Sequence, residues 1–129
     1  HIVPLPGGGR ALIQPIHVED AAEAVLRAAH LPQALGQTIH LAGPEAVPYR
    51  DLLRAIADAA GCRVHVVPLP LALVRAMAAM TRLVPGVPTI GDAEVLRLQE
   101  DKAVDISPMR KILKLSPRPL QEGLAETFA

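Results

Sequence analysis

The stretch QPIHVEDAA, residues 14–22, decides the fold because an extended segment gives way to a helix within it. Residues 11–18 have the character of a short extended segment. Asp20 then stands where a carboxylate caps a helix, with Glu23 three positions later as in a capping box. The pattern predicts a helix over residues 20–30. Its buried stripe is expected to hold the apolar residues at helical spacing, namely Ala21, Ala24, Val25 and Ala28.

Downstream of this helix, apolar runs alternate with turn signals. The stretch GQTIHLAGP, residues 36–44, alternates polar with apolar residues between glycines and predicts a strand over 37–42. A second short strand is predicted over 63–67. Helices are predicted over 48–60, 70–82, 89–100 and 107–114, and a last helix is expected to begin near Pro119.

These elements indicate a mixed, helix-rich α/β fold with two or three short strands and five or six helices. We expect residues 1–129 to form a single domain. So few strands do not make a stable sheet alone, because each strand needs partners along its edges. The strands are therefore expected to complete a sheet that begins in residues preceding this chain.

The glycine-rich stretch PLPGGGR, residues 4–10, predicts a loop, since three glycines and two prolines do not suit a regular element. A dinucleotide-binding fingerprint needs Gly-x-Gly-x-x-Gly between a strand and a helix. Here Leu12 stands where the third glycine belongs, and no apolar strand is predicted before the loop. We therefore expect no cofactor to be bound by this segment itself.

The composition of the chain limits which kinds of binding partner and which cellular compartment are expected. The chain has 13 basic and 13 acidic side chains and no long run of either sign, which argues against nucleic acid as a partner. The lone Cys62 has no partner for a disulfide, as is typical of a cytoplasmic protein. The longest apolar run, residues 64–80, contains His65, two prolines and Arg75, which argues against a membrane span.

The residue patterns of common catalytic and metal sites are missing. Tyr49 is followed four positions later by Leu53, so the chain lacks the Tyr-x-x-x-Lys pair in which a lysine lowers the pKa of a tyrosine. Tyr49 is interpreted as a helix-start residue whose ring packs on the core. Ser107 and Ser116 each precede a proline and are interpreted as helix caps. No two histidines have a metal-binding spacing, so no metal site is expected.

The order of several motifs resembles the C-terminal half of extended and atypical short-chain dehydrogenases/reductases. GRALIQPIHVEDAA (9–22) is similar to the h-V-x-D-hydrophobic-A signature of that family, and GQTIHLAGPE (36–45) resembles its last strand and G-P-E ending. YRDLL (49–53) resembles a helix start of the family, and SPMRKIL (107–113) with PRPLQEGL (117–124) resembles its tail. In that tail the family usually has a glycine where this chain has Lys114.

The closest subgroup contains NAD-dependent epimerase/dehydratases and the accessory NAD(P)H-binding subunit of respiratory complex I. The resemblance implies an upstream Rossmann half that binds NAD or NADP, with this segment as the lobe on the side of a small-molecule substrate. It also implies that Arg10, Gln14 and His17 lie on the substrate side. A structural role for His17 also remains open, in which its imidazole ring forms a hydrogen bond with Asp20 or with a backbone carbonyl.

Two functions remain open at this stage. In the first, the parent is an NAD(P)-dependent oxidoreductase or epimerase/dehydratase, and this segment is its non-catalytic substrate lobe. In the second, the parent is a non-catalytic scaffold that docks on a membrane complex or associates with a quinone. In either case we expect the isolated segment either to dimerise through its open strand edges or to form a non-native-like sheet.

Overall fold

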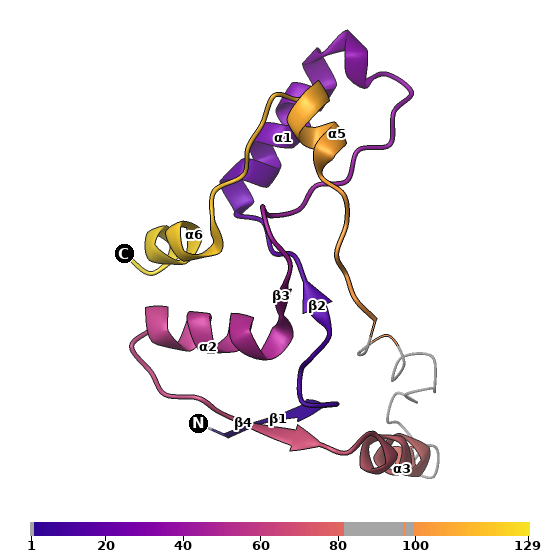
Figure 1. The fold of residues 1–129 in the computed structure, drawn as a ribbon, viewed down its shortest axis with the longest axis vertical. Coiled ribbons are helices and arrows are strands. Elements are labelled where there is room, and N and C mark those ends of the chain that lie inside the picture. The colour runs from indigo at the N-terminus through magenta and orange to yellow at the C-terminus, as the bar shows by residue number, and fades with distance from the viewer. Residues whose placement is uncertain (1, 82–96, 98–99) are drawn as a thin grey trace. The chain divides into compact units, whose positions relative to one another are not determined.

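The computed structural model describes residues 2–81, 97 and 100–129 (Figure 1). The chain divides into two compact units: unit 1 comprises His1–Leu12 and Pro48–Asp101, and unit 2 comprises Ile13–Val47 and Lys102–Ala129. Five α-helices and four short strands lie in the described residues, which confirms a mixed, helix-rich α/β fold. The helix predicted over 89–100 lies largely outside the described residues. A single domain over 1–129 stays a prediction.

Unit 1 contains a parallel two-stranded sheet. Strand β1 (Ile2–Pro6) pairs with β4 (His65–Leu69) in a register that places Ile2 opposite His65. The prediction that residues 4–10 form a loop was therefore wrong for the first half of that stretch. Prolines lack an N–H donor, but each of these strands has an edge that pairs with no other described strand, and an edge tolerates proline. The turn begins only at Gly7, whose N–H donates to Leu69.

The two described helices of unit 1 begin and end within one residue of their predicted bounds. Helix α2 (Tyr49–Ala59) buries Leu52 and Ala57, and Gly61 ends it at a φ of 66° while the Cys62 N–H donates to the Ala57 carbonyl. Tyr49 begins the helix, but its side chain is exposed rather than packed on a core. Helix α3 (Leu71–Thr81) follows Pro70 and carries the exposed apolar residues Leu73 and Met80.

Unit 2 is built on α1 (Val18–His30), which begins two residues earlier than predicted. Asp20 does not cap this helix. The N-cap residue is His17 and makes no side-chain capping bond, while Asp20 lies inside the first turn and is buried. Val25, predicted to be buried, is exposed, because the packed face of α1 is centred on Ala24.

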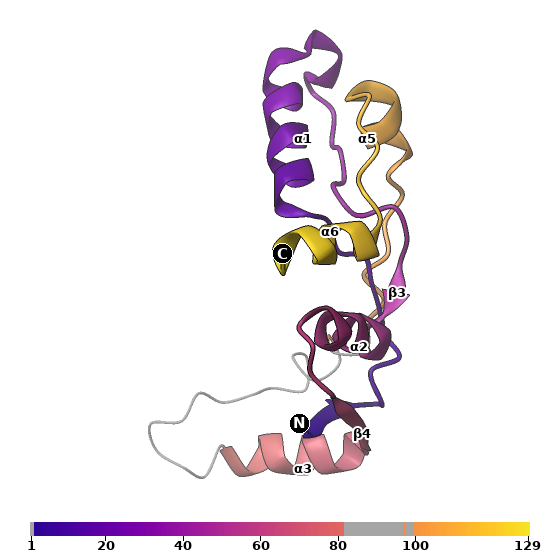
Figure 2. The same ribbon diagram turned by 90° about the vertical axis from the view of Figure 1, so that its left-hand side faces the viewer.

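An aliphatic core lies between α1 and the C-terminal segment, with α1 and α5 side by side in both views (Figures 1 and 2). Helix α5 (Ser107–Ile112) supplies Met109, which is fully buried. The other buried members of this core are Ala24, Ala42, Ile106, Leu113 and Leu115. Helix α6 (Leu120–Thr127) follows after a proline-rich connection, as predicted.

The remaining elements of the chain are short. Strand β2 (Leu12–Ile13) pairs with β3 (Val47–Pro48), and an isolated parallel bridge joins Ile13 to Lys102. A 3-10 turn, η1 (Pro32–Ala34), follows α1. The predicted strand over 37–42 is not paired with any described residue, so the prediction of a strand was wrong there. Its side chains still alternate in burial, with Ile39 and Leu41 packed against the core.

Two C-terminal predictions are corrected by the hydrogen bonds around α5 and α6. Ser107 is not the N-cap of α5: Ile106 is, and both the N–H and the hydroxyl of Ser107 donate to the Asp105 carboxylate. These bonds lower the pKa of Asp105. The N-cap of α6 is Pro119, so Ser116 does not cap that helix.

Lys114 has a φ of 53°, the left-handed conformation that glycine adopts with least strain. Lys114 therefore ends helix α5 in a conformation that is more often adopted by glycine.

Candidate functional site

The most extensive polar arrangement in unit 2 joins Asp20 at the start of α1 to Arg118 just before α6. The Arg118 guanidinium donates from Nε at 3.0 Å and from Nη2 at 2.8 Å to Oδ1 of Asp20. The backbone N–H of Arg118 donates to Oδ2 at 2.8 Å. A planar guanidinium fits a carboxylate in this forked manner, and charge-assisted bonds of this kind are the strong ones. The pair fastens two segments that are 98 residues apart in sequence.

Arg118 keeps the Asp20 carboxylate ionised. Burial alone raises the pKa of the Asp20 carboxyl, but the backbone bond, the side-chain bonds and the positive charge of Arg118 together lower the pKa below its ordinary value of 3.8. The same bonds raise the pKa of Arg118. A carboxylate held this way has its lone pairs occupied and stays charged near neutral pH. Asp20 is therefore suited to holding structure and poorly suited to accepting a proton in a reaction.

Two exposed carboxylates complete the environment of Arg118. Its Nη1 lies 3.2 Å from Glu19 Oε2 and also donates to Glu126 of α6. Each of these pairs is partly solvated and contributes less than the bond to Asp20. Arg118 is therefore surrounded by three acidic side chains, two from α1 and one from α6.

His17 lies beside this cluster and packs beneath α6. Its side chain is 12% exposed, and a Cβ built on Gly123 would come within 3.3 Å of the ring. Nδ1 has no hydrogen-bond partner among the described residues, and Glu19 Oε2 is 4.0 Å away. The prediction that Asp20 or a backbone carbonyl satisfies this ring was therefore wrong for Nδ1. The ring serves as packing surface for α6, and its role toward a substrate stays a prediction.

His17, Glu19 and Glu126 also come close enough to be considered as metal ligands, since one atom from each lies within 4.8 Å of the others. Arg118 already lies between the two glutamates and supplies the positive charge there. A second cation would have to displace the guanidinium, which is also tied to Asp20. The geometry therefore favours an ion-pair network at this place, and the expectation of no metal site stays a prediction.

Gln14 is committed to backbone partners within unit 2. Its Nε2 donates to the Gly43 carbonyl at 2.8 Å, and its Oε1 accepts from the Val104 N–H at 2.9 Å. The Gly43 N–H donates in return to the Gln14 carbonyl. One side chain therefore links three segments, and Gly43 is required because a Cβ there would lie 1.9 Å from the Pro15 carbonyl oxygen. A role of Gln14 toward a substrate stays a prediction.

Arg10 follows the glycine turn of unit 1 and has an exposed side chain. It makes no hydrogen bond or ion pair with another residue that the structure describes. The preceding turn is tightly built, because Gly9 has a φ of 64° and its carbonyl accepts from the Arg50 N–H. Arg10 thus extends from an ordered turn with its guanidinium unoccupied within the described parts of the chain.

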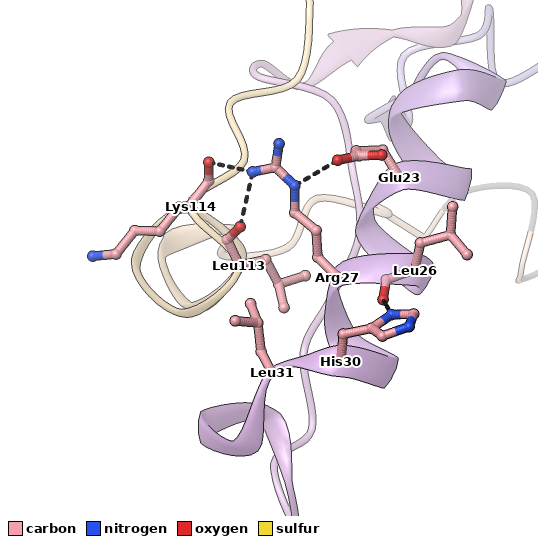
Figure 3. Close-up of a pocket in the computed structure, with 7 residues that line it drawn as sticks. All are labelled: Glu23, Leu26, Arg27, His30, Leu31, Leu113 and Lys114. Carbon is pink, nitrogen blue, oxygen red and sulfur yellow. Dashed lines mark hydrogen bonds and ion pairs between the residues drawn. The ribbon is translucent and has the colours of Figure 1, made fainter.

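A shallow cavity of about 480 Å³ lies along the C-terminal half of α1, lined by Glu23, Leu26, Arg27, His30, Leu31, Leu113 and Lys114 (Figure 3). Arg27 spans it: the guanidinium bonds Glu23 at 2.7 Å and donates to the carbonyls of Leu113 and Lys114. These carbonyls end helix α5, so Arg27 acts as a cap for that helix from outside. The cavity is open to solvent, and the Arg27 guanidinium that spans it already bonds Glu23 and two backbone carbonyls. The cavity is therefore a poor candidate for a substrate site.

Solved structures match this arrangement, while no protein-family model and no curated protein matches the sequence. The crystal structure of gox2253 superposes with a TM-score of 0.68 at 19% identity, covering 96% of this chain and 46% of that one. A nucleoside-diphosphate-sugar epimerase from Staphylococcus aureus, SAV0421, superposes with a TM-score of 0.61 at 19% identity, covering 97% and 43%. The chain has an epimerase-like fold. It spans less than half the length of either structure.

The epimerase-like fold accounts for a mixed α/β segment with few strands of its own. Among the residues that the structure describes, no helix is both long and apolar enough to cross a membrane. The Asp20–Arg118 pair escaped prediction from the sequence, because the two residues share no local spacing and Asp20 also fits a capping pattern. The nearest signal is the presence of both VEDAA and PRPL, because each holds one member of the pair, but neither motif indicates that the two segments meet.

Proposed function

We propose that this segment is the substrate-side part of an NAD(P)-dependent oxidoreductase or epimerase/dehydratase, and that residues outside it bind the cofactor. The observation that carries the proposal is the superposition of 96–97% of the chain on less than half of an epimerase and of a second protein. The sequence supports it, because the segment contains neither a complete dinucleotide fingerprint nor a Tyr-x-x-x-Lys pair.

Within this proposal Arg10 is the residue that contacts the substrate. A guanidinium pairs with carboxylate or phosphate groups in two parallel hydrogen bonds, so an anionic substrate group is its natural partner. Arg10 is exposed, while the Gln14 amide bonds two backbone groups and His17 packs beneath α6. Gln14 and His17 then act by positioning the loops around them.

The cofactor part of the proposal is tested by titrating NADH and NADPH, with nucleotide fluorescence as the readout, into two polypeptides. The 129-residue chain is expected to show no binding, and a polypeptide extended at its N-terminus by its native sequence is expected to bind one of the two. Saturable binding by the 129-residue chain would overturn the proposal. Failure of the folded, extended polypeptide to bind either nucleotide would also overturn it.

The role of Arg10 is tested in the extended polypeptide by isothermal titration with UDP-glucose, a nucleotide sugar of the class named for the Staphylococcus aureus epimerase. Arg10→Ala is expected to weaken binding by about 10-fold or more and Arg10→Lys by less, because a lysine keeps the charge without the fork. Arg75→Ala, on exposed α3, is the matched control and is expected to leave binding unchanged. Equal effects of Arg10→Ala and Arg75→Ala would remove Arg10 from the site.

A further inference from the structure

Helix α3, which follows β4 in unit 1, presents an apolar face to solvent (Figure 2). Leu73 and Met80 are 47% and 65% exposed, and Ala76 between them is exposed as well. These three residues are three and four positions apart, so they lie on one face of the helix. Leu71 and Val74, on the opposite side, are half-buried. A helix as apolar as this one is normally covered, so its open face indicates a surface that binds something.

The charges in the sequence around α3 are all of one sign. Between Asp58 and Asp92 the chain contains no acidic residue, although it has 13 of them in all. The same stretch contains three arginines, which are Arg63, Arg75 and Arg82. The chain as a whole has no net charge, so this imbalance is local. An arginine-containing stretch without carboxylates complements a negatively charged surface.

Arg75 lies at the border of the apolar face of α3. It is exposed, and it is three positions from Ala72 and four from Ala79, which are also exposed. Its guanidinium makes no hydrogen bond or ion pair with another residue in the described parts of the chain. The stem of an arginine can lie along apolar surface while its charged head stays among polar groups. Apolar side chains and a cation therefore meet on one side of this helix.

We propose that α3 docks on the surface of a phospholipid bilayer that contains anionic lipids. Leu73, Ala76 and Met80 enter the boundary between headgroups and acyl chains, and Arg75 contacts lipid phosphates. The 11 residues of α3 measure about 16 Å along the helix axis, roughly half of the ~30 Å apolar thickness of a bilayer. The helix therefore lies along the surface. This inference goes beyond the proposed function and does not depend on it.

Co-sedimentation of the 129-residue chain with phospholipid vesicles tests the proposal. The chain is expected to bind vesicles of equimolar phosphatidylglycerol and phosphatidylcholine. Binding to phosphatidylcholine alone is expected to be at least about 10-fold weaker, because the arginines then lack an anionic surface. Added salt is expected to weaken binding to the anionic vesicles, since it screens this attraction. No binding to the anionic vesicles, or equal binding to both kinds, would overturn the proposal.

An apolar substitution tests whether α3 is the docking face. Leu73→Gln is expected to weaken binding to the anionic vesicles by about 10-fold or more, because it replaces an apolar side chain that enters the lipid. Leu35→Gln is the matched control, since Leu35 is 79% exposed in unit 2, and is expected to leave binding unchanged. Circular dichroism confirms that both variants keep their helices. Equal binding by the two variants would remove α3 from the interface.

A charge substitution tests the role of Arg75. Arg75→Gln is expected to weaken binding by about 5-fold, while Arg75→Lys is expected to change it little because lysine retains the charge. Arg54→Gln, on an exposed arginine of α2, is the control and is expected to have no effect. An equal loss in Arg54→Gln and Arg75→Gln would mean that total charge, and not this face of α3, controls binding.

A fluorescent label shows which helix enters the lipid. Cys62→Ser removes the native thiol, and Ala76→Cys then provides one site on α3 for nitrobenzoxadiazole. Its emission is expected to shift to the blue when anionic vesicles are added, because the label leaves water. Ala22→Cys, at an exposed position of α1, is the control and is expected to show no shift. A shift at Ala22 without one at Ala76 would contradict the proposal.

Two further measurements distinguish lipid from other occupants of this face. A dimer seen by light scattering without lipid, and abolished by Leu73→Gln, would identify a second copy as the occupant and overturn the proposal. The N-terminally extended polypeptide is expected to bind anionic vesicles as the 129-residue chain does. Loss of binding on extension would show that preceding residues cover α3, and would also overturn it. NADH titration of the extended polypeptide reports on the proposed function separately, so either hypothesis can fail without the other.

Discussion

Units 1 and 2 hold themselves together in different ways. Unit 1 has a two-stranded parallel sheet and buries Leu5, Leu52 and Ala57 among its described residues. Unit 2 contains an aliphatic cluster centred on Met109 and Leu113 and adds the half-buried charge pair between Asp20 and Arg118. Backbone pairing between two strands and tight turns dominate the first unit, while side-chain packing and a charge pair dominate the second.

This difference predicts in which unit a substitution lowers the free energy of unfolding more. A local turn or a partly exposed strand can adjust to a new side chain, because its neighbours include solvent and flexible groups. A cluster assembled from residues about 90 positions apart has no such freedom, since every member is fixed by several others. We therefore expect matched substitutions to cost more in unit 2 than in unit 1.

The largest difference is expected at two glycines. Gly43→Ala places a Cβ 1.9 Å from the main-chain oxygen of Pro15, which cannot move aside without breaking the Gln14 contacts. The expected loss is roughly 4 kcal/mol of unfolding free energy. Gly9→Ala in unit 1 meets the end of the Leu5 side chain at 2.5 Å and the Arg50 backbone nitrogen at 3.2 Å, at a φ of 64°, and is expected to lose roughly 2 kcal/mol. Urea unfolding followed by circular dichroism measures both, and equal losses would contradict the comparison.

The next difference is expected in the cores. Met109→Ala removes a fully buried side chain from unit 2 and is expected to cost about 3 kcal/mol. Leu52→Ala in α2, where the residue is 8% exposed, is expected to cost about 2 kcal/mol. Amide exchange assigns each loss to its unit, through Ala24 for the first and Ala57 for the second. A larger effect of Leu52→Ala would reverse the order of the two cores.

A buried charge and an exposed one provide the third comparison. Asp20→Asn retains the shape but removes the charge that Arg118 contacts, and is expected to cost about 2 kcal/mol at neutral pH. Asp51→Asn in unit 1 weakens only partly solvated ion pairs with Arg54 and Arg50, and is expected to cost less than about 0.5 kcal/mol. Urea unfolding at pH 7 measures both.

The dependence of stability on pH provides a second measurement of the Asp20–Arg118 ion pair. Because the folded pKa of Asp20 lies below 3.8, the folded state binds a proton more weakly than the unfolded chain. Its contribution is therefore fully present above about pH 4 and is lost as the pH falls further. Asp20→Asn is expected to flatten the acid limb of stability against pH between about pH 2 and pH 5. An unchanged acid limb would show that Asp20 is not ion-paired.

The smallest effect is expected where two helices end. Lys114 has a φ of 53° after α5, and Lys114→Gly is expected to stabilise the chain by about 0.5 kcal/mol because glycine adopts this conformation with little strain. Gly61→Ala, at a φ of 66° after α2, is expected to destabilise by about 1 kcal/mol. Thermal melting of both variants checks the opposite signs, and a loss of stability in Lys114→Gly would contradict this account.

Local patterns predicted most of the helices but not the roles of their polar residues. The cores of α1, α2, α3 and α6 follow from apolar spacing and from proline and glycine signals, and Gly61 ends α2 as expected. Asp20 and Ser107 were both interpreted as caps because short polar residues at helix starts usually are. Each instead has a partner that the capping pattern does not include, in Arg118 and Asp105.

The sequence by itself determined the helix-rich α/β class, the likeness of its motif order to the dehydrogenase family, and the absence of a complete dinucleotide fingerprint. These depend on periodicity and on residues close together in the chain, which a sequence displays directly. Tertiary structure decided that residues 2–6 pair with 65–69, that 38–42 stay unpaired, and that Arg118 holds Asp20. Each depends on which distant segments meet. Backbone hydrogen bonds and the attraction between opposite charges, which must offset the cost of desolvation, stabilise these contacts without leaving a local pattern.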